Sequence, residues 1–317
     1  MVYPNTAAEQ YAKENNCKYE YYYNGGAKVS FTGNLLSLEE SYILYVYTDY
    51  AEGNTTIPNG ISARVTYPDG KMTSNILPTK KENLKRNDPA SGTVYPFGIP
   101  FAAKEINDEV IVQIFQNGTD IPLSDPITVS VAKYCNDLCR LDTATEEQKN
   151  LAQKLLTYAT YSQLYFGYNT DKLAKPIADC SLSDTADVIA ALSNCPEEPG
   201  FIGKKRYVDS LYVYGTSMIL DSTIVYRVYL LTDYSDTPSH CGLESVSTEI
   251  DVYYKDIPVP LITQLGDDMN VQMNDVYVVG KPIAYIKATL SKTTDESLKN
   301  ICIALYDYYM AAKAYQQ

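Results

Sequence analysis

The chain has no tryptophan, one histidine and six phenylalanines in 317 residues. A single histidine, His240, leaves no room for multi-histidine metal centres or HExxH zinc sites, and a His-based triad is all but excluded. His240 stands next to Cys241, and neighbours in sequence cannot readily form the hydrogen bond that activates a thiol nucleophile. We therefore interpret His240 as a loop residue without a catalytic role. Glycine-rich phosphate loops and dinucleotide-binding fingerprints are also missing.

Long apolar runs are missing as well, since no stretch approaches the roughly 18 apolar residues that a membrane span requires. The start, Met1 to Pro4, is followed at once by polar residues and predicts no signal peptide in this stretch. The net charge is −13, and phosphate binding needs clustered Lys and Arg. The basic run 80–86 is the local exception, which we interpret as a solvated loop. We expect no nucleic-acid partner and no membrane insertion.

Cysteine is present in an odd number, seven, at spacings that match no metal-binding pattern. Cys135 and Cys139 lie four residues apart on one face of a predicted helix, where a disulfide has poor geometry. Cys180 and Cys195 flank a short amphipathic segment and could close a loop, with buried free thiols as the alternative. The sequence predicts no metal and no cofactor.

Tyrosine, in contrast, is abundant, with 31 residues. Its large apolar ring and water-tolerant hydroxyl suit half-exposed strands and adhesive surfaces. The chain also repeats itself: the stretch 149–166 returns as 299–315, and the pattern Y-x-x-Y-x-x-T-D-Y at 42–50 returns at 226–234. We interpret this as a duplicated module. The repeated tyrosines, which a shared fold would place in both cores, are Tyr42, Tyr45, Tyr226 and Tyr229.

The spacing of apolar residues predicts an α+β fold, with two tandem copies of an antiparallel sheet or sandwich-like module, each closed by a C-terminal helical pair. We expect the stub of a repeat array or a cap at 1–22, a first copy at 23–168 with a long insertion at 51–95, an ordered connector at 169–205 and a second copy at 206–317. Helices are predicted at 7–15, 132–140, 146–166, 282–290 and 295–315, with an amphipathic piece at 186–192. Strands are predicted at 19–23, 27–32, 41–47, 61–67, 94–101, 110–115, 127–131, 210–214, 217–220, 223–231, 247–254 and 276–280.

Two segments resemble known families. The pattern A-E-x-Y-A-K-E-N at 8–15 resembles the closing unit of BspA-type leucine-rich repeats of bacterial surface proteins. The span 27–315 resembles a tandem module at the C-terminal end of secreted Firmicutes surface proteins. That likeness is carried by YFGYNTDKLA at 165–174, and in the second copy by Ala284-Tyr285 and the pattern L-x-N-x-x-x-A-L-Y-x-Y at 298–308. The resemblance implies an extracellular, secreted or wall-associated protein of a gut or rumen bacterium. It brings no catalytic residues.

Paired carboxylates are the surviving catalytic possibility, as in glycoside hydrolysis. Acidic residues are plentiful, but none lies in a setting that singles it out. Asp267, Asp268, Asn270 and Asp275 offer oxygen ligands without the spaced loop of a calcium site, so a turn is the preferred interpretation. The acidic residues considered are Glu39, Glu40, Asp49, Glu105, Asp108, Glu109, Asp267, Asp268 and Asp275.

Binding is therefore favoured over catalysis. Exposed tyrosines can stack on sugar rings while Asn, Asp and Gln supply hydrogen bonds, although the lack of tryptophan counts against a carbohydrate platform. The candidates are Tyr67, Tyr95 and Phe97 near the insertion and Tyr253 and Tyr254 in the second copy, with cross-strand packing as the alternative for each. We predict a monomeric, non-catalytic module that binds polysaccharide on a bacterial surface or in a secreted complex, with an exposed row of aromatics. The alternatives are a structural or protein-binding module of a leucine-rich adhesin, with one apolar patch, and a glycoside hydrolase.

Overall fold

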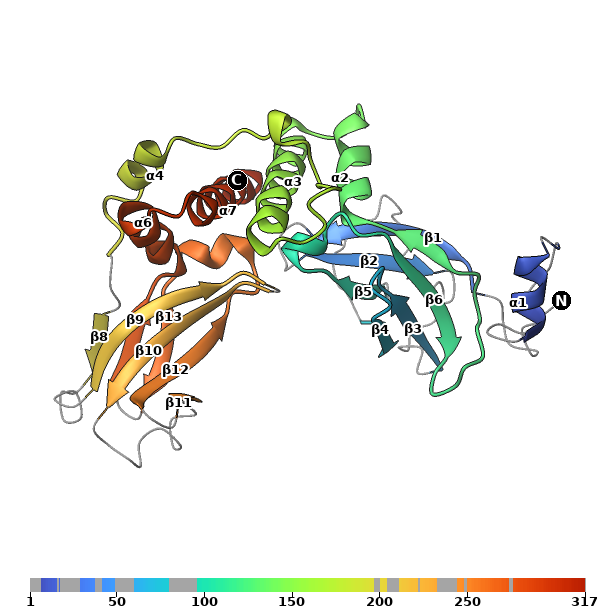
Figure 1. Ribbon diagram of the computed structural model, residues 1–317, viewed down its shortest axis with the longest axis horizontal. Coiled ribbons are helices and arrows are strands. Elements are labelled where there is room, and N and C mark those ends of the chain that lie inside the picture. Colours follow the sequence, from blue (N-terminus) through green and yellow to red (C-terminus); the bar gives the residue numbers. More distant parts are fainter. Residues whose placement is uncertain are drawn as a thin grey trace. The chain divides into compact units, whose positions relative to one another are not determined.

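The computed structural model confirms the α+β class: its described part contains four antiparallel sheets and six α-helices (Figure 1). The chain divides into two compact units. Unit 1 comprises Met1–Ser37, Ile43–Pro100 and Asp108–Tyr134, and unit 2 comprises Leu38–Tyr42, Phe101–Asn107 and Cys135–Gln317. The described residues are 7–15, 17, 29–37, 42–48, 60–79, 96–196, 200–203, 211–221, 223–232, 244–247, 250–273 and 276–316.

Unit 1 holds two sheets. One has the order β1 (Phe31–Ser37), β2 (Ile43–Thr48), β5 (Phe97–Pro100), and the other β4 (Met72–Ile76), β3 (Ile61–Thr66), β6 (Val110–Gln116), β7 (Ile127–Val129). β3 alternates over most of its length, because Ile61, Ala63 and Val65 are buried while Arg64 and Thr66 are half-buried; Ser62, at its start, is buried as well. The helix α1 (Ala7–Glu14) also belongs to this unit, and α2 (Val131–Arg140) begins in it.

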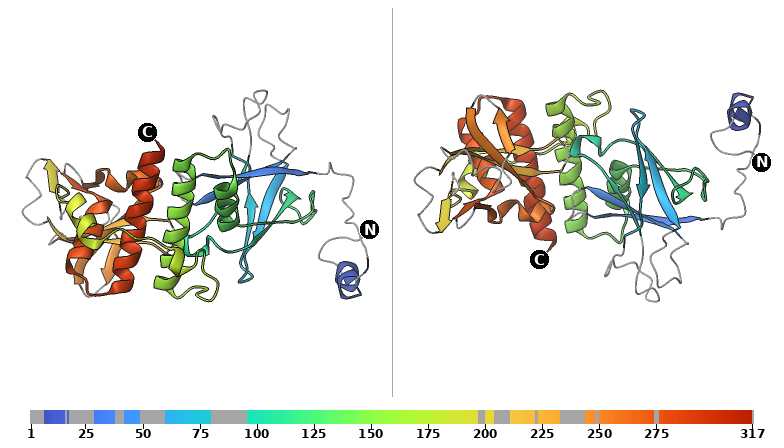
Figure 2. Two further views of the ribbon diagram at one scale, coloured as in Figure 1. Left: turned by 90° about the horizontal axis from the view of Figure 1, so that it is seen from above. Right: turned by 90° about the horizontal axis from the view of Figure 1, so that it is seen from below.

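Unit 2 also holds two sheets, together with a layer of helices. The sheets have the orders β11 (Glu244–Ser247), β12 (Ile250–Pro258), β10 (Val225–Thr232), β9 (Leu211–Ile219), and β13 (Met269–Met273), β14 (Val276–Gly280), β8 (Gly200–Gly203). The helices α3 (Glu146–Phe166) and α7 (Glu296–Tyr315) lie side by side in both views of Figure 2. The shorter helices α4 (Thr185–Ala191) and α6 (Pro282–Lys292) pack against each other and α7.

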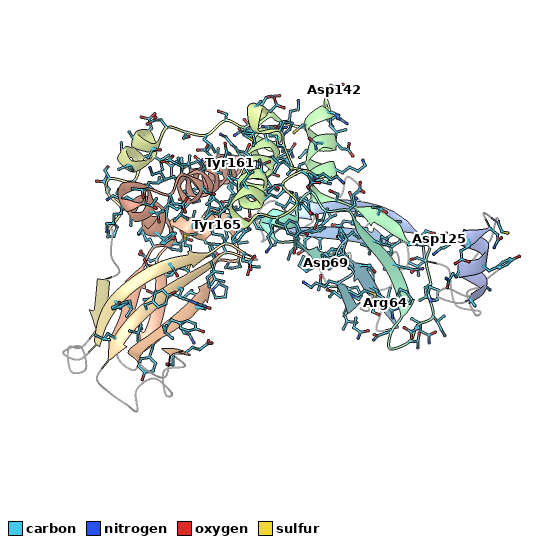
Figure 3. All side chains as sticks on the ribbon, viewed as in Figure 1. Arg64, Asp69, Asp125, Asp142, Tyr161 and Tyr165 are labelled. Atoms are coloured by element: carbon cyan, nitrogen blue, oxygen red, sulfur yellow. The ribbon has the colours of Figure 1, made fainter. Side chains whose placement is uncertain are left out.

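Local signals explain why the two long helices begin where the sequence predicts. Thr145 caps α3 in a capping box with Gln148: its hydroxyl accepts from the Gln148 N–H, and the Gln148 side chain accepts from the Thr145 N–H. Asp295 caps α7 by accepting from the amides of Ser297 and Leu298. Both helices bury one face, and Tyr165, labelled in Figure 3 near the end of α3, is 36% exposed.

The contact between α3 and α7 is built on aromatic side chains. The rings of Tyr158 on α3 and Tyr308 on α7 are nearly parallel with centroids 6.2 Å apart, and Tyr42 completes a triangle at 6.2 and 6.3 Å. All three side chains are buried, which raises the pKa of each phenol. Tyr42 adopts a φ of 33°, a left-handed conformation that is uncommon for a non-glycine residue. The prediction that Tyr42 lies in the core is confirmed.

Several other predictions are settled by the described residues. Tyr45 and Tyr226 are buried as expected, whereas Tyr229 is half-buried and points to the opposite face of its strand from Tyr226. β4, β8 and β13 were not predicted, and β11 overlaps the predicted strand 247–254 only at Ser247. The two strands expected around Gly215 form one strand, β9. Cys180 and Cys195 are free thiols, as the alternative to a disulfide expects, but both are half-buried rather than buried. The predicted strand at 19–23, the basic run 80–86 and His240 lie outside the described residues.

Candidate functional site

Two of the three aromatic residues predicted near the insertion, Tyr67 and Phe97, are buried. Phe97 on β5 has no exposed area. Tyr67 follows β3, is 9% exposed, and donates its hydroxyl hydrogen to the carbonyl oxygen of Pro100 at 3.0 Å. Their rings therefore pack within unit 1, as the cross-strand alternative expects. Tyr95 lies outside the described part of the chain.

Tyr253 and Tyr254 are consecutive residues of β12 and therefore point to opposite faces of its sheet. Tyr253 is paired with Leu230, whose side chain is buried, and so lies on the inner face. Tyr254 is paired with Tyr229 and lies on the outer face, and both of these side chains are half-buried. Of the predicted candidates, Tyr254 is thus the one that lies on the outer face.

The register places polar and aromatic side chains in two rows across this outer face. The first row crosses all four strands, from Gly215 on β9 through Tyr229 and Tyr254 to Glu244 on β11. The second row, two residues along β10, runs from Ser217 through Arg227 to Asp256. We call this surface the tyrosine face, defined by Gly215, Ser217, Arg227, Tyr229, Glu244, Tyr254 and Asp256.

Arg227 and Asp256 form a bidentate ion pair at the centre of the tyrosine face. Nε donates to Oδ1 at 2.6 Å and Nη2 donates to Oδ2 at 2.7 Å. The side chains are 23% and 37% exposed, and these hydrogen bonds raise the pKa of the guanidinium. Its carbon also lies 3.9 Å from the centroid of the Tyr254 ring, in a cation–π contact. Arg227 is therefore fixed by both neighbours rather than free in solvent.

Both tyrosines of the face are held by their hydroxyls. Tyr254 donates to the carboxylate of Glu244, and this hydrogen bond raises the pKa of the phenol. Tyr229 accepts from the hydroxyl of Ser217 at 3.3 Å, and its ring centroid lies 6.3 Å from that of Tyr254, with the planes tilted by 54°. The pair, held at hydroxyls and by Arg227, forms a preorganised surface.

The flank of Tyr229 toward β9 is open. Gly215 is its partner there, and a Cβ added to Gly215 would meet no atom within 4 Å. The register shifts at this point, because Val213 pairs with Leu230 and Tyr214 is left as the extra residue of a bulge. The Tyr214 side chain is 70% exposed. A third aromatic side chain therefore stands at the edge of the tyrosine face, next to a position without a side chain.

Sequence reasoning found Tyr254 but missed its neighbours. The repeat predicts that Tyr229 lies in the core, whereas the alternation of side chains along β10 places it on the outer face. Arg227 is a charged residue in the middle of the strand and marks the outer face, and Tyr229, two residues on, shares that face. The pairing with Asp256 joins residues 29 apart, which no local pattern signals.

The acidic residues considered for catalysis have separate structural surroundings where they are described. Glu105 accepts from the Ala102 amide at 2.9 Å and caps a 3-10 helix, and Asp268 lies 3.4 Å from the Lys281 ammonium. Asp108 is buried, with 6% exposure. Within the described residues, no group of three or more His, Cys, Asp and Glu side chains is placed to hold a metal ion. Glu39, Glu40, Asp49 and Asp275 lie outside those residues.

The string 165–174, which carries the resemblance, has a structural role. Gly167 ends α3 in the left-handed conformation, with φ 62°, and Tyr168 donates to the carbonyl of Gln163. The Gln163 side chain is fully buried: its oxygen accepts from the Ala174 amide at 2.8 Å and its nitrogen donates to the Lys172 carbonyl at 3.1 Å. These hydrogen bonds therefore hold the loop part of this string against the end of α3.

No protein-family model, no curated protein and no solved structure matches the chain. Among the helices that the structure describes, none combines the length and the apolar character needed to cross a membrane. The case for a function therefore rests on the residues of the tyrosine face.

Proposed function

We propose that the chain is a non-catalytic binding module and that its tyrosine face binds polysaccharide. The observation that carries this proposal is the row of Tyr229 and Tyr254, flanked by Tyr214 and by the charged pair of Arg227 and Asp256. Aromatic rings offer apolar faces to the C–H groups of a sugar, and the adjacent charged groups offer hydrogen bonds to its hydroxyls. A sheet face that combines both suits an extended glycan chain.

The rigidity of the face supports binding of a flexible polymer. Side chains that must be ordered when a ligand binds cost about 0.5–1.5 kcal/mol each. The Tyr254 ring already contacts Arg227 and Tyr229. Hydrogen bonds hold each of the three to a neighbour: Arg227 to Asp256, Tyr229 to Ser217 and Tyr254 to Glu244. The open flank beside Gly215 leaves room for a sugar ring next to Tyr229.

We also propose that the chain is a tandem duplication, as the repeats predict. The order of elements supports it: β1-β2-β5 in unit 1 and β9-β10-β12 in unit 2 are each three neighbouring antiparallel strands. Each set is followed by a 3-10 helix, a pair of antiparallel strands (β6-β7 or β13-β14) and two helices in the chain. The two units can be aligned by strand pairing, with the pair of Ile43 and Pro100 placed on the pair of Val225 and Pro258. In this alignment the two copies of the repeat Y-x-x-Y-x-x-T-D-Y are offset from each other by two residues.

This alignment explains why we assign binding to unit 2. The positions of Arg227 and Tyr229 are taken in unit 1 by Tyr45 and Tyr47, which are 3% and 7% exposed and pack with Leu35 and Ile43. The corresponding face of unit 1 is therefore closed. The resemblance to secreted surface modules further supports an extracellular, wall-associated or secreted location, where polysaccharide is accessible.

Retention on a panel of soluble and insoluble polysaccharides, by affinity electrophoresis and pull-down, tests the proposal. Tyr254→Ala and Tyr229→Ala each remove one ring and should weaken binding about tenfold. Gly215→Leu removes no side chain of the tyrosine face but fills the space beside Tyr229, so it should abolish binding while the protein stays folded. Tyr11→Ala, which removes a tyrosine that is 65% exposed on α1, is the matched control and should bind as the unmodified chain does. Retention unaffected by all three face variants would refute the site.

A protein-binding role is the second candidate, favoured by a different surface. Met72, Thr66, Ile111 and Thr128 are paired in one row across the outer face of the β4-β3-β6-β7 sheet. Met72 is 64% and Ile111 46% exposed, so this row is partly apolar. On the same face Arg64, labelled in Figure 3, has its guanidinium carbon 4.0 Å from the centroid of the Phe115 ring and forms an ion pair with Asp120. A panel without any retained glycan would favour this role.

A further inference from the structure

The charges of the tyrosine face limit the kind of glycan that it can bind. The face carries two carboxylates, Glu244 and Asp256, and one guanidinium, Arg227. Glu244 is exposed, so its negative charge faces any ligand that covers Tyr254. The other basic residue of these four strands is Lys255, which is paired with the buried Val228 and so belongs to the inner face. The net charge of the tyrosine face is therefore −1, from two carboxylates and one guanidinium.

The guanidinium is also committed to partners within the protein. A uronate carboxylate is recognised best by the two-donor edge of an arginine. In Arg227, Nε and Nη2 already donate to the two oxygens of Asp256, and the guanidinium carbon lies 3.9 Å from the centroid of the Tyr254 ring. An incoming carboxylate could still approach the N–H groups that Asp256 does not use, but Asp256 already balances the charge of the guanidinium. The face therefore offers no uncompensated positive charge to an anion, and it presents the exposed carboxylate of Glu244.

We propose that the ligand of the tyrosine face is an uncharged polysaccharide, and that the face selects against glycans that carry uronate or sulfate groups. This inference rests on the proposed function and names its substrate class. Neutral sugar hydroxyls donate hydrogen bonds to carboxylates, so Glu244 and Asp256 are acceptors for an uncharged chain. The same oxygens repel an anionic chain. Repulsion between two unit charges about 4 Å apart in water corresponds to about fivefold weaker binding for each close contact.

A matched pair of polymers tests the selection. Hydroxyethylcellulose and carboxymethylcellulose share a backbone and differ in the charge of their substituents, and methyl-esterified pectin and polygalacturonate form a second pair. Affinity electrophoresis of the full chain on each pair, at low and at high salt, gives the ratio of affinities. We expect the neutral member of a retained pair to bind at least about fivefold more tightly, with the gap narrowing as salt screens the repulsion.

Charge variants test whether the tyrosine face causes the preference for uncharged glycans. Glu244→Gln keeps an acceptor for the Tyr254 hydroxyl and removes the charge, so the ratio between the members of a pair should fall by about fivefold. Asp187→Asn removes the same charge from an exposed position on α4 and should leave the ratio unchanged. Equal or tighter binding of the anionic member, or an unchanged ratio in Glu244→Gln, would overturn the inference while leaving glycan binding in place. No retention of either member of any pair would overturn the proposed function itself.

Discussion

Gln163 provides the sharpest test of how the loop after α3 is held. The perturbation is Gln163→Ala. Its side chain is fully buried, accepts from the Ala174 amide at 2.8 Å and donates to the Lys172 carbonyl at 3.1 Å. The Lys172 carbonyl keeps a second donor, the Asn107 side chain at 3.0 Å, whereas no other partner for the Ala174 amide is described.

The expected cost follows from these contacts. An orphaned buried amide costs about 2 kcal/mol, a lost hydrogen bond to a carbonyl that retains another donor about 1 kcal/mol, and one buried methylene about 0.8 kcal/mol. Gln163→Ala should therefore lower the free energy of unfolding by about 4 kcal/mol. Gln163→Leu restores the buried volume but not the hydrogen bonds, so it should cost about 3 kcal/mol.

Urea unfolding measures the free energies, and hydrogen exchange of the peptide that contains Ala174 locates the change. Gln153→Ala is the matched control on the same helix, because this half-buried glutamine donates to the weak acceptor Cys139 Sγ at 3.1 Å. It should cost about 1 kcal/mol or less. A loss below about 1 kcal/mol in Gln163→Ala, or one equal to that of Gln153→Ala, would refute the reasoning.

Two further predictions concern unit 2. Asp307 is 5% exposed and accepts from the Lys154 ammonium at 2.9 Å and the Ser183 hydroxyl at 2.6 Å, so Asp307→Asn should lower the free energy of unfolding by about 3 kcal/mol. A double-mutant cycle with Lys154→Met measures the coupling, and additive losses would contradict a stabilising ion pair. Burial raises the pKa of Cys302 to about 12, so its thiol stays protonated at neutral pH and should react with a thiol reagent only after unfolding, whereas exposed Cys17 should react at once. Labelling followed by peptide mass spectrometry distinguishes the two, and prompt modification of Cys302 in the folded protein would contradict its burial.

The helices could be predicted because the information that sets them is local. The capping residues Thr145 and Asp295 precede their helices directly, and the apolar residues of α3 recur at the helical period. Alternation also located several strands, among them β3 and β10. β4 was missed because MTSNI contains one apolar residue at each end and reads as polar loop.

The tyrosine face could be predicted only in part, because tyrosine is compatible with both sides of a sheet. Tyr226 is buried with 1% exposure and Tyr229 is half-buried, although both are tyrosines of one strand. Which of them faces outward follows from strand pairing, and the pairing of β10 with β12 joins segments about 30 residues apart. The sequence also could not separate Tyr254 from Tyr67 and Phe97, because all three are aromatic residues of strand-like segments. In the structure Tyr67 and Phe97 are buried inside unit 1.

The two units differ at the position where the tyrosine face has its ion pair, and this difference bears on the origin of binding. In the alignment by strand pairing, the pair of Arg227 and Asp256 takes the place of Tyr45 and Gly98. A Cβ at Gly98 would lie 3.1 Å from Ile43 Cγ2 and 3.3 Å from Tyr45 Cε1, so the Tyr45 ring occupies the space that a side chain there would need. Unit 1 thus closes this face with a tyrosine over a glycine, while unit 2 holds an arginine against an aspartate and leaves its two rings half-buried. Under the proposed duplication, this difference is what divergence of one copy for the proposed binding would produce.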